Sequence, residues 1–431
     1  MNGRDNMQFN PTESYNVIVI GGGTSGLMAA INAAQNGANV LIVEKNRRIG
    51  RKLLLTGGTR CNVTNRTTRE DLIEHIPGNG KFLYGPLNQF DQEDIIDFFE
   101  SKGVKLKEED HGRMFPVTDR SQTILDTLIE ELNQYDVTIK LREPVEDIIY
   151  DMENNRVQGV KTENGGMYGA NSIVLAIGGK AYPKTGTTGD GYRLAKNAGH
   201  TITSLYATEV PLTSEDSHIK DRFMQGVPLR DVEVTVWDDQ DKAIVKHNLD
   251  MIFTHFGYSG PAILRSSGHV NTYMRDTGAE ICHLSIDLIP EISKEEWLKE
   301  AEDNREKQLK TLLKTWMPES MGELICRQLG FDPSSPFKQL NHGEVDQLVQ
   351  KIKHFEITAN GSLPIEKGYV TGGGVDTKEV NPKTMESKMM SNLFFCGELL
   401  DINGYTGGYN ITAAFVTGTI AGQNAAWQGF A

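Results

Sequence analysis

Residues 15–46 read YNVIVIGGGTSGLMAAINAAQNGANVLIVEKN, and this stretch decides the fold of the chain. The apolar run at residues 17–20 predicts a β-strand, and small or apolar residues at helical spacing predict a helix that begins at about Ser25. A second apolar run, at residues 39–43, predicts the next strand and ends beside Glu44. A strand, a glycine-rich turn, a helix and a strand in this order indicate a Rossmann-like α/β fold.

The glycines of this turn have the GxGxxG spacing of a dinucleotide-binding fingerprint. Gly21 permits the tight turn, Gly23 lets the backbone approach a diphosphate, and Gly26 lets the helix pack closely on the strand. Glu44 is placed to accept hydrogen bonds from a ribose diol, and it would repel a 2′-phosphate, so the pattern disfavours NADP here. Because strand, helix and acid all agree with the glycines, the sequence predicts a nucleotide site.

The composition is that of an ordinary globular protein. With 431 residues, of which 38% are hydrophobic and 24% charged, the chain is long enough for two or three domains. The polar residues 1–16 lack the basic start of a signal peptide, and no apolar run is long enough to cross a membrane, so we expect a cytoplasmic location. The four cysteines form no CxxC pair, which indicates a reducing compartment, and we expect no metal site.

Charge is distributed unevenly along the chain. The net charge of −14 disfavours broad attraction to nucleic acid. Residues 45–69 nevertheless contain no acidic residue and eight basic ones: Lys45, Arg47, Arg48, Arg51, Lys52, Arg60, Arg66 and Arg69. Two interpretations stay open, a cradle for a cofactor diphosphate beside a solvated loop, or a groove that extends to an anionic substrate.

The next part of the chain predicts further α/β structure. Amphipathic patterns over residues 91–102 and 121–135 predict two helices, with Asp91 and Ser121 as caps. Short β-like runs between residues 137 and 177 predict a small antiparallel meander between two strands of the parallel sheet. The last run leads to Gly178 at the carboxyl edge of the sheet, where ligands bind in open α/β folds.

From about residue 203 the pattern is mixed, with β-like pieces followed by a charged helix over residues 295–316. Ser293 and Glu296 form a capping box before this helix. Glycine-rich character returns near residue 365. We therefore expect a discontinuous FAD-type nucleotide-binding domain, residues 1–202 with 367–431, and an inserted β-rich substrate or cap domain, residues 203–366, whose helical part covers about 290–340.

Two further blocks carry residues suited to a flavin nucleotide. In RIGRKLLLTGGTRCNVTN, residues 48–65, Arg51 and Lys52 can reach a diphosphate or the adenosine end, and a loop can bring backbone amides against a ring system: Thr56, Gly57 and Gly58. In the block at residues 394–418, a strand reaches Gly397 and Glu398, a bend ends at Gly408, and a helix opens near Asn410. The N-terminus of that helix would stabilise a reduced, anionic flavin ring.

The motifs GRKLLLTGGTRCNVTN, LAIGGKAYPKTGTTGDGY, IFTHFGYSGPAIL and CGELLDINGYTGGYN resemble the BaiN/RdsA family of bacterial flavoproteins. The resemblance spans nearly the whole chain. It implies a two-dinucleotide-fold FAD-binding domain interrupted by a β-rich insertion with a helical subdomain. One departure is Thr59, where the family more often has a third glycine before Arg60.

The resemblance also implies a cofactor and a class of reaction. Noncovalent FAD would contact a set of residues from both ends of the chain: Ser25, Glu44, Arg51, Lys52, the backbone of Val145, Glu398, Asn410 and Ile411. NAD(P)H would be the donor, binding transiently because no second GxGxxG is present, and the acceptor would be an electron-poor C=C bond, in uridine of ribosomal RNA or in a steroid-like enone. An amine oxidase that releases peroxide, and a flavin-containing sensor or scaffold without turnover, are the alternatives.

Four residues are candidates for chemistry or gating, each with a structural alternative. Cys61 could donate a proton near the flavin, although free cysteines are commonly small core residues. His255, in FTHFGYSGP, could act as a general acid or as a structural hydrogen-bonding residue. Tyr182 and Tyr409 could stack on a ring, although buried tyrosine with a satisfied hydroxyl is more common.

Overall fold

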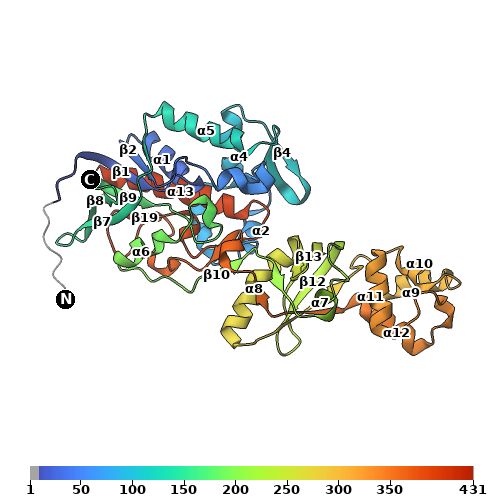
Figure 1. Cartoon of the computed structure of the whole chain (residues 1–431). Coiled ribbons are helices and arrows are strands. Elements are labelled where there is room, and N and C mark those ends of the chain that lie inside the picture. The colour runs from blue at the N-terminus through green and yellow to red at the C-terminus, as the bar shows by residue number, and fades with distance from the viewer. Residues whose placement is uncertain (1–8, 431) are drawn as a thin grey trace. The chain divides into compact units, whose positions relative to one another are not determined.

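The computed structural model describes residues 9–430, so residues 1–8 of the polar leading segment lie outside the described part (Figure 1). The chain forms two compact units. The discontinuous unit combines the residues up to Leu205 with those from Val370 onward, and the inserted unit is Tyr206–Tyr369. Each unit has its own hydrophobic core.

The discontinuous unit is built on a seven-stranded sheet of order β6-β2-β1-β9-β8-β7, in which β19 also pairs with β9. The strands are β1 Glu13–Ile20, β2 Val40–Glu44, β6 Thr138–Leu141, β7 Val145–Asp151, β8 Arg156–Thr162, β9 Met167–Leu175 and β19 Leu393–Phe395. β6, β2, β1, β9 and β19 pair in parallel, whereas β7, β8 and the start of β9 form an antiparallel meander. The carboxyl ends of β1, β2, β9 and β19 therefore meet at one edge.

Two helices from opposite ends of the chain pack tightly against each other in this unit. They are α1, Thr24–Gln35, and α13, Tyr409–Gly429. A Cβ added at Gly418 would lie 2.4 Å from the Ser25 carbonyl oxygen, and one at Gly422 would lie 2.0 Å from that of Ala29. Glycine at these positions lets α13 approach α1 closely and ties the C-terminal segment to the fingerprint.

The discontinuous unit contains further helices and strands. They are α2 Arg69–Glu74, α3 Tyr84–Leu87, α4 Gln92–Ser101, α5 Ser121–Gln134, α6 Asp190–Asn197, β3 Thr64–Asn65, β4 Leu106–Glu109, β5 Arg113–Pro116 and β18 Val370–Gly372. The cap of α4 is confirmed, because Asp91 forms a capping box with Asp94. The predicted cap of α5 is wrong: Ser121 lies within the helix, and its hydroxyl donates to the Leu54 carbonyl at 2.9 Å.

The inserted unit contains a seven-stranded antiparallel sheet of order β16-β15-β12-β13-β14-β11-β17. Its strands are β11 Leu212–Thr213, β12 Pro228–Trp237, β13 Ala243–Phe253, β14 Gly257–Ser259, β15 Cys282–Asp287, β16 Phe355–Ala359 and β17 Gly361–Ser362, and β10 covers Tyr206–Thr208. Its helices are α7 Ser217–Lys220, α8 Pro261–Thr277, α9 Lys294–Asp303, α10 Leu309–Leu313, α11 Glu319–Leu329 and α12 His342–Lys353.

The single helix predicted over residues 295–316 is wrong. The capping box of Ser293 and Glu296 begins α9, but that helix ends at Asp303 and α10 begins at Leu309. The amides of Leu309 and Lys310 donate to carbonyls of residues 335 and 333, at 2.9 and 3.0 Å, in place of a preceding helical turn. The loop at residues 333–335 thus supplies the hydrogen-bond acceptors that the preceding turn of a continuous helix would have provided.

Within residues 9–430, no helix is both long and apolar enough to cross a membrane. The same part of the chain holds no group of three or more His, Cys, Asp or Glu side chains that could bind a metal ion.

Candidate functional site

The fingerprint glycines have the geometry that the sequence predicts for them. Gly21 has a φ of +104°, and a Cβ there would lie 2.6 Å from the Ala176 carbonyl oxygen. A Cβ at Gly26 would lie 1.9 Å from the Gly21 carbonyl oxygen, so this position needs glycine for the close contact of helix and turn. A Cβ at Gly23 would meet no atom within 4 Å. Gly23 therefore borders open space at the N-terminus of α1, which fits an approaching diphosphate.

Glu44 ends β2 with its side chain buried, at 7% exposure. One carboxylate oxygen, Oε2, accepts from the Gly22 amide at 2.8 Å, and Oε1 accepts from the Asn46 amide and Nδ2 at 2.7 and 2.6 Å. A carboxylate offers about four lone-pair sites. The three protein donors leave room for one more, and a ribose hydroxyl fits that site.

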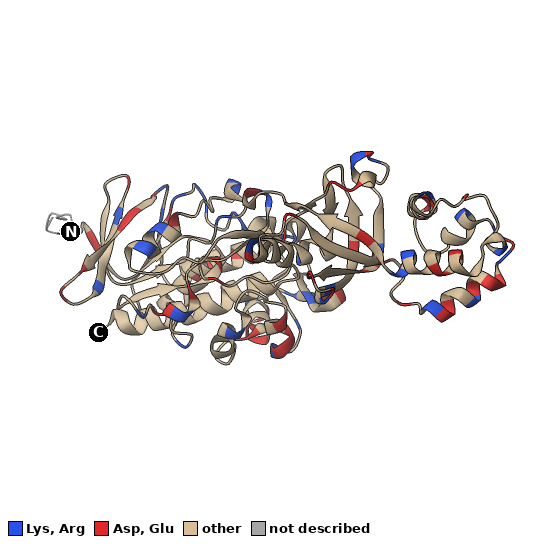
Figure 2. Cartoon of the chain, turned by 90° about the horizontal axis from the view of Figure 1, so that it is seen from below, with Lys and Arg blue, Asp and Glu red and all other residues tan. Residues whose placement is uncertain are grey.

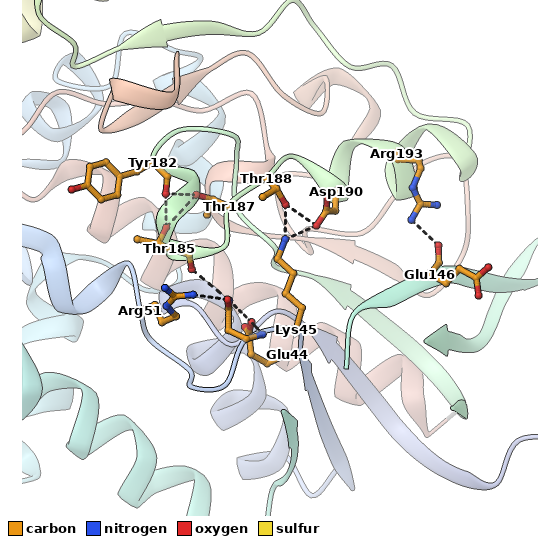
Figure 3. A network of polar contacts seen from close by, with 11 residues as sticks. Glu44, Lys45, Arg51, Glu146, Tyr182, Thr185, Thr187, Thr188, Asp190 and Arg193 are labelled. Atoms are coloured by element: carbon orange, nitrogen blue, oxygen red, sulfur yellow. Dashed lines mark hydrogen bonds and ion pairs between the residues drawn. The ribbon is translucent and has the colours of Figure 1, made fainter. Parts of the chain in front are cut away.

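Figure 3 shows side chains after β2 that form hydrogen bonds and an ion pair with the loop at residues 182–190. Arg51 donates to Asn46 Oδ1 at 2.7 Å and to the Lys184 carbonyl at 2.6 Å. Lys45 contacts the Thr188 hydroxyl and the Asp190 carboxylate, each at 2.5 Å. The predicted contact Arg51 is thus linked to Glu44 through Asn46.

The structure brings a second group of predicted site residues together. Lys52 Nζ lies 2.6 Å from Glu398 Oε2, while Glu398 Oε1 accepts from the Thr371 amide at 2.8 Å. A Cβ at Gly178 would lie 4.0 Å from the same Oε2. Gly397 has a φ of +71°, and a Cβ there would lie 2.4 Å from Ser25 Oγ. Segments far apart in sequence therefore converge beside α1.

The loop after Thr56 is held in a strained conformation. Gly57 and Gly58 have φ values of +56° and +66°, and Thr59 and Cys61 also have positive φ, +74° and +62°. Thr59 is where the resembling family more often has glycine, and a left-handed φ is the conformation that glycine adopts at least cost. Gly58 is exposed, and a Cβ there would meet nothing within 4 Å. This backbone is open to a ligand.

The remaining predicted contacts lie at the start of α13 and of β7. Gly408 is the N-cap of α13, with a φ of +100°, and Ile411 in the first turn packs on the core. The Asn410 carboxamide holds the preceding bend: it accepts from the Gly404 amide at 2.8 Å and donates to the Gly404 carbonyl at 2.7 Å. Val145 begins β7, and the Glu143 amide just before it donates to the Glu44 carbonyl at 3.0 Å.

The four candidates for chemistry or gating lie in different surroundings. Cys61 is fully buried, and burial raises the pKa of its thiol to about 12, which favours a core role. Tyr409 is 4% exposed and stacks on His75 with ring centres 4.6 Å apart. Tyr182 is half-buried with a φ of +57°. His255 is exposed in the turn between β13 and β14, beside the Phe256 ring, in the inserted unit.

Two residues near this site were missed in the sequence. Asn62 and Asn65 are 7% and 1% exposed, and the Oδ1 atom of each has no hydrogen-bond partner among residues 9–430. The available signal was two asparagines three residues apart in the run CNVTN, residues 61–65.

The basic stretch at residues 45–69 is not an uninterrupted positive surface. Its ion pairs with acids from elsewhere in the chain are Lys45–Asp190, Lys52–Glu398, Arg60–Glu109, Arg60–Asp119, Arg66–Glu93, Arg66–Glu108 and Arg69–Asp91. Figure 2 shows basic and acidic positions interspersed over the molecule. Arg47 and Arg48 are exposed.

A Rossmann-like sheet, a glycine turn that borders open space and a buried acid at the next strand define a dinucleotide-binding α/β protein. Residues 15–424 match the family described as "HI0933-like protein Rossmann domain", and the chain belongs to this family of flavoprotein oxidoreductases.

Three relatives match along nearly their whole length. The chain is 31% identical to the "Ribosomal RNA dihydrouridine synthase" of Haemophilus influenzae, over 92% of this chain and 95% of that one. It is 30% identical to the protein of the same description from Escherichia coli, over 96% and 98%. It is 29% identical to the "3-dehydro-bile acid delta(4,6)-reductase" of Clostridium scindens, over 95% and 98%.

Among solved structures, 3-ketosteroid delta1-dehydrogenase from Sterolibacterium denitrificans resembles the fold, with a TM-score of 0.53 and 15% identity, over 96% of this chain and 100% of that one.

Proposed function

We propose that this protein uses noncovalent FAD and NAD(P)H to reduce an activated C=C bond, and that its substrate is uridine in ribosomal RNA, which becomes dihydrouridine. The observation that carries the proposal is the pair of relatives described as ribosomal RNA dihydrouridine synthases, 31% and 30% identical over more than nine-tenths of each chain. Bound FAD would supply the hydride carrier between the nicotinamide and the C=C bond.

The contacts of the discontinuous unit support FAD as the flavin. Glu44 keeps an acceptor site for a ribose hydroxyl, a group that FMN would not bring to this strand end. The open backbone at Gly23 and the N-terminus of α1 suit a diphosphate. The N-terminus of α13, a 21-residue helix, suits the negative charge of a reduced flavin ring.

The ion-paired arginines at positions 66 and 69 support contact with RNA phosphates. Arg66 pairs with Glu93 at 3.2 Å, and Arg69 with Asp91 at 2.8 Å. Both members of the Arg66–Glu93 pair are exposed, whereas Arg69 and Asp91 are partly buried. An exposed pair such as Arg66–Glu93 contributes about 0 to 1 kcal/mol, so a phosphate can replace its carboxylate at small cost. Arg47 and Arg48 add exposed positive charge, and an unstacked uridine held by such contacts could be presented to the flavin.

The decisive experiment is mass spectrometry of the nucleosides in ribosomal RNA from a deletion strain. We expect one dihydrouridine to be lost and to return when the gene is restored. An unchanged dihydrouridine content after deletion would reject ribosomal RNA as the substrate.

A charge-reversed variant, Arg66→Glu with Arg69→Glu, tests how the RNA is held. We expect it to have lower activity on RNA than the wild type at low salt and a shallower loss of activity as salt rises, with an unchanged flavin spectrum. Arg156→Glu is the matched control, because Arg156 is also exposed and ion-paired but lies in the meander. Equal salt dependence in the double variant and in Arg156→Glu would show that the RNA does not contact Arg66 and Arg69.

Reduction of a small enone is a second candidate, favoured by the 29% identity to the bile-acid reductase. Anaerobic oxidation of NAD(P)H by a steroid enone, together with unchanged dihydrouridine in the deletion strain, would favour it. Reduction of the flavin by an amine, with release of peroxide in air, would favour an amine oxidase, and no turnover with any of these would leave a sensor or scaffold.

A further inference from the structure

Asn62 is a buried carboxamide whose hydrogen-bonding groups the described protein does not use. Its residue exposure is 7%, and its Oδ1 has no hydrogen-bond partner within residues 9–430. A buried acceptor without a partner is costly, and native structures rarely leave one without a ligand, water or functional reason. Asn62 Oδ1 can therefore accept a hydrogen bond from a ligand.

Asn65 Oδ1 also has no partner, but the carboxamides of Asn65 and Asn410 are held in place by other hydrogen bonds, whereas the structure shows none for the Asn62 side chain within residues 9–430. Asn65 is anchored, because its Nδ2 donates to the carbonyls of His111 and Gly407, at 2.9 and 3.0 Å. Asn410 is anchored by both of its groups to the bend before α13. With no such anchor, the Asn62 carboxamide keeps hydrogen-bonding capacity for a ligand.

Asn62 lies between the two segments that are proposed to meet the flavin ring. A Cβ at Gly57 would be 2.8 Å from the backbone nitrogen of Asn62, which places Asn62 against the strained loop at residues 57–61. A Cβ at Gly408 would be 3.1 Å from Asn62 Oδ1, which places the carboxamide against the N-cap of α13. The unpartnered Asn62 Oδ1 and the N-terminus of α13 are independent observations, and both indicate a ligand site beside Gly408.

We propose that Asn62 is a positioning residue that binds the imide edge of the flavin's pyrimidine ring. A carboxamide carries an acceptor beside a donor, and the imide edge carries an N3–H beside a carbonyl, so the two can form a pair of hydrogen bonds. Oδ1 would accept from N3–H, and Nδ2 would donate to the adjacent carbonyl. The inference rests on the proposed FAD binding and adds a residue that sets the orientation of the ring.

The test uses the whole protein, freed of flavin and titrated with FAD and with 3-methyl-FAD, which lacks the N3–H. The wild type should bind FAD about tenfold more tightly than the analogue, the loss expected for one hydrogen bond and an unsatisfied acceptor. Asn62→Leu has similar volume and no polar group, and its preference for FAD should fall to about twofold or less. The readout is dissociation constants from flavin fluorescence, independent of turnover.

Asn424→Leu is the matched control, because Asn424 is 9% exposed and lies further along α13, with its Nδ2 bonded to the Ile420 carbonyl at 2.8 Å. It should keep the wild-type preference. If Asn62→Leu does not fold, the smaller and polar Asn62→Ser takes its place.

A preference for FAD that is the same in the wild type and the Asn62 variant would overturn the inference, as would a wild type that binds both flavins equally. Failure of the wild type to bind FAD at all would instead refute the proposed function.

Discussion

Replacing Glu44 with glutamine tests the nucleotide site with little change in shape. In the structure Glu44 Oε1 accepts two hydrogen bonds from Asn46, and Oε2 accepts one from the Gly22 amide. Glutamine has one acceptor oxygen, and its amide group can only donate. Glu44→Gln therefore loses either the Asn46 pair or both the Gly22 bond and the acceptor proposed for the ribose.

The expected magnitude follows from these contacts. A hydrogen bond to a charged group is worth about 1.5 to 3 kcal/mol, so loss of the ribose contact should raise the dissociation constant of FAD roughly 10- to 150-fold. The flavin-free protein should lose about 1 to 3 kcal/mol of unfolding free energy, because the Gly22 amide or the Asn46 groups lose their acceptor.

The assay is fluorescence titration of the flavin-free protein with FAD at 25 °C, together with urea unfolding. Glu153→Gln, at an exposed position in the turn between β7 and β8, is the control and should change neither quantity. Glutamine can keep its oxygen at the ribose position, so the deciding variant is Glu44→Ala, which has neither acceptor: if it binds FAD within twofold of the wild type, the ribose contact is refuted. If it is nevertheless less stable, Glu44 serves only to hold the turn.

Three further predictions concern stability. Thr59→Gly should raise the unfolding free energy by about 0.5 to 1 kcal/mol, because a left-handed φ of +74° costs threonine more than glycine loses in chain entropy; no gain in urea unfolding would contradict the strain. Gly422→Ala should cost about 1 to 3 kcal/mol, since its Cβ would lie 2.0 Å from the Ala29 carbonyl oxygen, whereas Gly343→Ala, with a nearest contact of 3.3 Å, should cost little; equal effects would argue against the tight helix contact. Burial lowers the pKa of His200 below its usual 6.5, so the stability it contributes is present above about pH 6.5 and is lost as the pH falls below that value; the wild type should lose more unfolding free energy between pH 7.5 and 5.5 than His200→Gln, and an equal loss would remove His200 from the effect.

The pattern of residues 15–46 was sufficient for the core of the nucleotide fold. The strands β1 and β2, the helix α1 and the positions of Gly21, Gly26 and Glu44 follow from local spacing. Apolar periodicity and glycine positions act over a few residues, so a sequence shows them directly. The family motifs added the fold class and the flavoprotein class, which the family match confirms.

Contacts between distant segments could not be read in the same way. The helix over residues 295–316 is broken because the loop at residues 333–335 supplies carbonyl acceptors to the amides at the start of the second half. The basic stretch at residues 45–69 meets acids at positions such as 93, 190 and 398, and Asn62 is left without a partner where α13 begins. The sequence by itself determined the local elements and the fingerprint, whereas tertiary structure alone decided which charges are paired and which polar groups remain for a ligand, because those depend on chain closure over tens to hundreds of residues.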